Sequence, residues 1–151
     1  MRNMSNMRIP HDAFVLVGDG RKALFLRNHG DAKFPNLRVE RVMKHENPPT
    51  HAQGTDRPGR AFQSADARRS GMEQTDWHEL EEQRFARDTA AALEKLVRDQ
   101  AAKTIIIVAP ARTLAELRSA YHVEVKNRIM AEIDKDLTKH PVYEIEKHLT
   151  S

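Results

Sequence analysis

Short apolar runs rich in β-branched residues divide the chain and predict five β-strands. The runs cover residues 13–18, 22–27, 37–45, 104–108 and 128–134. The first two flank Asp19-Gly20, and Asp-Gly between apolar runs predicts a hairpin because glycine adopts positive φ at low cost. The third run alternates apolar and charged residues, as expected for an edge strand with one solvated face. The fourth is the most apolar and predicts a central strand covered on both faces.

Apolar residues at helical spacing predict three helices. We expect them over residues 76–98, 113–121 and 142–149. The first two open on capping-box spacing, with an acidic or hydroxyl residue followed three positions later by glutamate. Residues 123–133 also fit a continued helix, but the alternation within 128–134 favours a strand.

The predicted order is three strands, a loop, and then helix, strand, helix, strand, helix. Three meandering strands followed by alternating units predict an α/β domain of three layers, with a mixed five-stranded sheet and flanking helices, of the ribonuclease H-like kind. We expect a flexible leader over residues 1–12 and a single α/β domain over 13–151. Within it, a long basic loop over 46–75 connects the third strand to the longest helix.

Composition narrows the possible functions. The chain has 151 residues and a formal charge of +3, which permits an acidic partner such as RNA without requiring one. It has no cysteine, which excludes disulfides, thiolate catalysis and cysteine-based zinc sites. No apolar run reaches membrane-spanning length and the start lacks the apolar centre of a signal peptide, so we expect a cytoplasmic protein without membrane insertion.

Acidic residues flank the predicted strands and raise the question of a nuclease. Asp19 follows the first strand, and Asp134 and Asp136 follow the last. A two-metal site needs several carboxylates converging on strand ends, and the first strand carries none inside it. We therefore interpret Asp19 and Gly20 as turn residues, and Asp134 and Asp136 as residues that shape the approach to the last helix. The eight histidines form no metal motif, so we expect neither metal nor cofactor.

The long loop carries the best candidates for binding. Four arginines and one aspartate lie in the segment from Arg57 to Arg69, and Gly54, Gly59 and Gly71 interrupt the loop. Arginine makes forked contacts with phosphate, so this segment is a candidate for wrapping a nucleic-acid backbone. The alternative is a solvated loop in which arginine pairs with nearby aspartate. The candidate binding residues in the loop are Arg57, Gly59, Arg60, Arg68 and Arg69, with Asp56 and Pro58 as structural positions.

Several stretches together resemble the host attachment protein family (protein required for attachment to host cells). They are Val15-Leu-Val-Gly-Asp-Gly-Arg-Lys-Ala23, Asp56-Arg-Pro-Gly-Arg60, Glu82-Gln-Arg-Phe-Ala-Arg87, Ile107-Val-Ala-Pro-Ala-Arg-Thr-Leu114 and Glu132-Ile-Asp-Lys-Asp-Leu-Thr138. That bacterial family is similar to the middle domain of eukaryotic and archaeal peptide release factors. The resemblance implies a hairpin start, a glycine-rich loop and a helix with Arg84-Phe-Ala-Arg87, and so adds Arg84 and Arg87 to the candidates.

The resemblance also implies translation-related function, with one departure. Release factors carry Gly-Gly-Gln at the loop tip, where it assists hydrolysis of peptidyl-tRNA, and this chain has no Gly-Gly-Gln. The expected function is therefore a non-enzymatic domain that contacts tRNA or the ribosome through the loop. The alternatives are a protein-interaction component of a host-attachment pathway and a release-factor-like peptidyl-tRNA hydrolase. The sequence leaves the oligomeric state open.

Overall fold

A five-stranded sheet forms the centre of the computed structural model, which describes residues 7–45 and 62–150, with side chains from 77 onward in the second range. The strand order is β3-β2-β1-β4-β5. The strands are β1 (Phe14–Gly18), β2 (Lys22–Asn28), β3 (Leu37–Lys44), β4 (Ile105–Ala109) and β5 (Ile129–Asp134). The mixed five-stranded α/β fold is confirmed, as is the strand over 128–134.

The Asp-Gly signal forms the predicted hairpin. β1 and β2 pair antiparallel, with Gly18 opposite Ala23. An Asp19 carboxylate oxygen accepts from the backbone N–H groups of Arg21 (2.9 Å) and Lys22 (2.8 Å). Gly20 has φ +93°, a conformation that glycine adopts without strain. β3 continues the meander on β2, while β4 and β5 add in parallel on the other side of β1.

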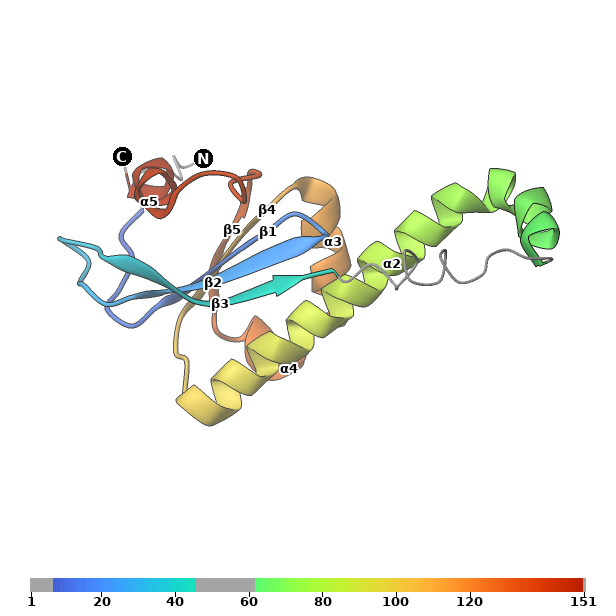
Figure 1. Cartoon of the computed structure of the whole chain (residues 1–151). Coiled ribbons are helices and arrows are strands. Elements are labelled where there is room, and N and C mark those ends of the chain that lie inside the picture. Colours follow the sequence, from blue (N-terminus) through green and yellow to red (C-terminus); the bar gives the residue numbers. More distant parts are fainter. Residues whose placement is uncertain (1–6, 46–61, 151) are drawn as a thin grey trace.

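Helices cover both faces of this sheet (Figure 1). They are α2 (Phe62–Gln100), α3 (Ala111–Ala120), α4 (Val123–Lys126) and α5 (Val142–Thr150). In Figure 1, α5 lies above the sheet, while α4 and the nearer part of α2 lie below it. Helix α3 packs with α2 and α4, because Leu114 and Leu117 belong to the same apolar cluster as Phe85 and Val125. The strand residues that face α2 form one apolar cluster with Phe85 and Leu93 of that helix. The opposite face forms a second cluster with Ile145 and Leu149 of α5.

The longest helix begins earlier than the sequence pattern predicts. α2 starts at Phe62 rather than Asp76, so residues 62–75 of the expected loop are helical, including Arg68 and Arg69. This stretch has no proline and contains two alanines, two glutamines, two arginines and a methionine, all good helix formers. Because residues 62–75 contain few large apolar residues, they show no amphipathic periodicity from which a helix could be predicted. The remaining loop candidates Asp56, Arg57, Pro58, Gly59 and Arg60 lie outside the described residues.

Two further boundaries differ from expectation. The described part of the expected leader packs on the domain, because Ile9 is fully buried and the backbone N–H of Met7 donates to the carbonyl of Leu149 at 3.0 Å. The helix expected to start at Thr113 begins at Ala111, directly after Pro110, and Thr113 is buried within it without a capping bond. The short helix α4 lies at the start of residues 123–133, the stretch that also fitted a continued helix.

Candidate functional site at the base of a helical arm

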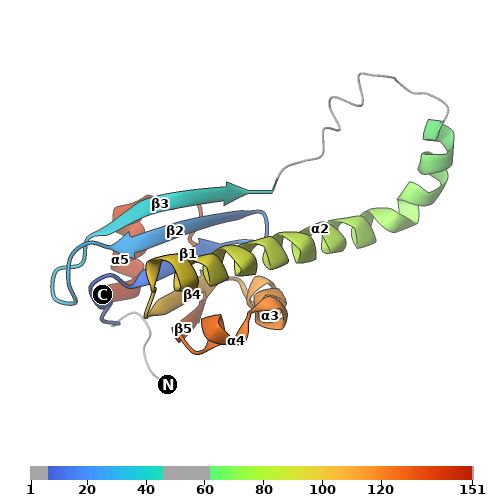
Figure 2. The same cartoon turned by 90° about the horizontal axis from the view of Figure 1, so that it is seen from below.

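Helix α2 has an anchored part and a projecting part. Its buried residues lie between Glu81 and Val97, whereas the four preceding described side chains, Trp77 to Leu80, are all exposed. Figure 2 shows α2 crossing the sheet and continuing past its edge. We call the projecting part, Phe62–Leu80, the arm. At 1.5 Å per residue the arm extends about 28 Å.

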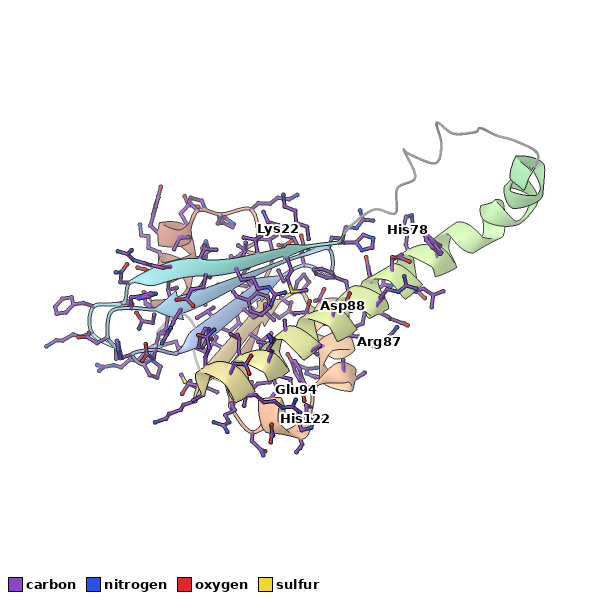
Figure 3. The ribbon with its side chains drawn as sticks, turned by 60° about the horizontal axis from the view of Figure 1, so that its bottom comes forward. Lys22, His78, Arg87, Asp88, Glu94 and His122 are labelled. Carbon is purple, nitrogen blue, oxygen red and sulfur yellow. The ribbon has the colours of Figure 1, made fainter. Side chains whose placement is uncertain are left out.

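The candidate arginines are distributed along this helix. Arg68 and Arg69 belong to the arm, and Arg84 and Arg87 follow in the first turns of the anchored part. Arg84 is 63% exposed, with a guanidinium nitrogen 3.6 Å from a Glu81 carboxylate oxygen. Arg87, labelled on α2 in Figure 3, is exposed and borders a hollow of about 320 Å³ lined by residues of α2 and α3. The Arg-Phe-Ala-Arg motif thus presents two cations to solvent while Phe85 and Ala86 enter the core.

A pocket of about 250 Å³ lies where the arm meets the sheet. Three elements contribute to it: the β1–β2 turn, the residue after β3, and α2 on both sides of the point where the arm joins the anchored part. Its lining consists of Gly20, Arg21, His45, Trp77, His78, Glu81 and Glu82. Sequence reasoning missed this pocket, although Trp77 with Glu81 and His78 with Glu82 have the four-residue spacing that places side chains on one helix face.

Glu81 is the most buried charged side chain of the pocket. The side chain is 9% exposed, and one carboxylate oxygen lies 3.5 Å from His45 Nε2. The His45 ring packs edge-on against Phe85, with 6.3 Å between ring centroids, and its backbone N–H donates to the Arg21 carbonyl. The contacts of Glu81 with His45 and Arg84 are both longer than a hydrogen bond. Both oxygens therefore keep lone pairs available to a third group.

Beside the pocket, one arginine holds together three glutamates. Arg112, in the first turn of α3, lies 3.2 Å from Glu79, 3.6 Å from Glu82 and 3.7 Å from Glu116. Burial, followed by the nearby charge of Glu82, raises the pKa of Glu116 above its ordinary value. One oxygen of Glu116 is buried and has no hydrogen-bond partner among the described residues. This network links the arm and the start of the anchored helix to α3.

The side chain of Thr138 bridges Asp19, which follows β1, and Asp136, which follows β5. The Thr138 hydroxyl lies 3.1 Å from an Asp19 oxygen and 2.9 Å from an Asp136 oxygen, while Asp134 is exposed at the end of β5. Asp136 also accepts from the Thr138 backbone N–H at 3.2 Å. This arrangement connects the β1–β2 turn with the loop after β5, and the structural roles expected for Asp134 and Asp136 stay a prediction. Among the described residues, no three histidine or acidic side chains are grouped so that they would hold a metal ion.

Within the described ranges, none of the helices combines the length and apolar character needed to cross a bilayer.

Comparison with known proteins identifies the family. The sequence profile described as "Bacterial archaeo-eukaryotic release factor family 12" matches residues 12–149, nearly the whole described domain. No curated protein sequence matches the chain. The profile match supports the release-factor part of the resemblance and does not extend to host attachment. The chain belongs to family 12 of the bacterial archaeo-eukaryotic release factors.

Proposed function

We propose that this protein is a non-enzymatic translation-related domain that binds tRNA or the ribosome through the arm of α2. The observation that carries the proposal is the projection of a helix with Arg68 and Arg69 beyond the sheet, followed by the exposed Arg84 and Arg87. Membership of a release-factor family supports a translation-related partner. A role of this kind is exercised in the cytoplasm, where ribosomes are.

The physical basis is electrostatic. Arginine binds phosphate oxygens through a planar fork of donors, and neutralised phosphates release counterions. An arm of about 28 Å has the reach to enter a groove between RNA helices while the sheet remains outside. The modest net charge of +3 leaves the position of the arginines, rather than overall charge, to determine where RNA binds.

Hydrolysis of peptidyl-tRNA has less support. The chemistry of release factors resides in Gly-Gly-Gln, which this sequence lacks. The proposal therefore predicts binding without turnover. A host-attachment partner would instead be a protein, and capture of one defined protein that survives ribonuclease treatment would favour that alternative.

The test measures binding of tRNA and ribosomes over a range of salt concentrations. Two double variants, Arg68→Ala/Arg69→Ala and Arg84→Ala/Arg87→Ala, each remove two positive charges. Each is expected to weaken binding and to reduce the slope of log affinity against log salt by about 1.4, since one phosphate contact contributes about 0.7 for single strands.

The matched control is Lys103→Ala/Lys126→Ala, which also removes two positive charges. Lys103 and Lys126 are exposed, before β4 and in α4, respectively. In Figure 3, His78 lies on α2 near the base of the arm, whereas His122, next to α4, lies beside Glu94 in the later part of α2. Equal losses for the control and the two arginine variants, or unchanged cosedimentation with ribosomes in both arginine variants, would overturn the proposal.

A further inference from the structure

We infer that the pocket at the base of the arm is a base-binding site that takes an unpaired guanine. The inference deepens the proposed function, and rests on it, where the base belongs to a bound RNA strand. The pocket contains three features that guanine recognition needs: an aromatic surface, a carboxylate held in place, and a cation at the opening. All three come from described residues.

The first feature is an exposed aromatic ring beside a small cavity. Trp77 lines the pocket and remains 48% exposed, which is unusual for so large an apolar side chain with no described burial against the core. Proteins that recognise unpaired RNA bases stack them on such rings. The cavity of about 250 Å³ is smaller than the pockets that hold drug-sized ligands, and its size suits one heterocyclic base.

The second feature is the Glu81 carboxylate at the pocket wall. Guanine presents two adjacent donors, N1–H and N2–H, and a carboxylate accepts both at once. Adenine and cytosine instead place a ring-nitrogen acceptor beside their amino group, which a carboxylate repels. Glu81 is 9% exposed and is held between His45 and Arg84 at distances that leave its lone pairs available. Uracil offers only one donor, N3–H, between two carbonyl acceptors. A carboxylate placed in this way therefore favours guanine over the other three bases.

The remaining lining groups complete the recognition. Glu82 places a second carboxylate in the lining, and its contact with Arg112 at 3.6 Å keeps it on the α3 side. His78 provides a ring nitrogen for the guanine O6 acceptor. Arg21 is exposed in the β1–β2 turn and is the cation available for the phosphate of the same nucleotide.

The chain has one tryptophan, so Trp77 itself reports on ligand binding. The experiment titrates the full chain separately with GMP, AMP, CMP and UMP and follows Trp77 fluorescence, corrected for nucleotide absorbance with free tryptophan. We expect saturable quenching by GMP, with an affinity at least about tenfold above that for the other three nucleotides. Absence of saturable quenching by GMP, or equal quenching by all four nucleotides, overturns the inference.

Two variants test the carboxylate separately from folding. Glu81→Gln replaces one acceptor oxygen by a donor and is expected to abolish the preference for GMP. Because Glu81 also contacts His45 and Arg84, circular dichroism of Glu81→Gln checks that this variant folds. Glu82→Gln is a second pocket variant and is expected to bind GMP more weakly. The control is Glu79→Gln, a carboxylate of the same helix that contacts Arg112 but does not line the pocket. Retention of the GMP preference in Glu81→Gln contradicts the role of Glu81 in guanine recognition.

A second experiment distinguishes a base within an RNA strand from a free nucleotide as the ligand of the pocket. A short uridine oligonucleotide with one central guanosine is compared with GMP and with oligouridine. Tighter binding of the guanosine oligonucleotide indicates a base within a strand, whereas equal affinity indicates a nucleotide site. The two proposals are tested by different measurements. Salt-dependent tRNA binding by the arginine variants tests the arm, and quenching of Trp77 fluorescence by GMP tests the pocket.

Discussion

The division of α2 into an anchored and a projecting part predicts very different effects of one chemical change at two positions. Leu93 is fully buried in the cluster between α2 and the sheet. Leu80, in the last turn of the arm, is 54% exposed. The perturbation is leucine to alanine at each position, which removes the same atoms from one helix and leaves helix propensity nearly unchanged because both residues are good helix formers.

The expected magnitudes follow from burial. Leu93→Ala removes packed atoms and leaves a cavity, which costs about 3 kcal/mol of unfolding free energy and lowers the folding equilibrium constant roughly a hundredfold. Leu80→Ala removes a half-exposed side chain with no core contact, so the expected change is about 0.5 kcal/mol or less. Urea denaturation followed by far-ultraviolet circular dichroism measures both, with the m-value checking that unfolding remains two-state.

The reasoning fails if the two variants lose similar stability. A loss of about 2 kcal/mol or more for Leu80→Ala would mean that the arm packs against another part of the chain and is not free for a ligand. A loss below about 1 kcal/mol for Leu93→Ala would mean that α2 is not anchored where the buried cluster places it.

Two further predictions concern stability. Asn28 is fully buried, donates to the Ile9 carbonyl at 2.8 Å and accepts from the Gly30 backbone N–H at 2.9 Å. Asn28→Ala leaves these buried groups unpaired and is expected to lower the unfolding free energy, measured by urea denaturation, by about 3 kcal/mol. A loss under about 1 kcal/mol refutes this role. The pKa of Glu116 is raised by burial, so the native state holds that proton more tightly than the unfolded chain and loses stability as pH rises above the ordinary value of 4.5. Glu116→Gln is therefore expected to raise the melting temperature at pH 7, and this gain is expected to disappear below about pH 4.5. The control Glu79→Gln is expected to show no such gain. A lower melting temperature for Glu116→Gln at pH 7 contradicts a raised pKa of Glu116.

Local sequence patterns were sufficient for the strands and the first turn. The apolar runs predict five strands that the structure contains within one or two residues, because a buried strand needs a short continuous or alternating apolar run. Asp19 and Gly20 determine the hairpin through bonds that span only three residues. The Arg84-Phe-Ala-Arg87 motif also pointed to the release-factor family that the profile match shows. These features depend on neighbours in the chain, so the chain alone reveals them.

Other features depend on contacts between distant residues, and only the tertiary structure decided them. The sequence pattern places the start of α2 too late because residues 62–75 contain few large apolar residues and therefore give no periodic signal, although several of them favour helix. The pocket joins Arg21, His45 and Trp77 from three separate elements, and Thr138 meets Asp19 across the sheet edge. The sequence by itself determined which segments become strands and which family the chain belongs to. The packing of those segments decided where the arm projects and which side chains meet at its base, since spatial proximity follows from the way apolar faces bury one another.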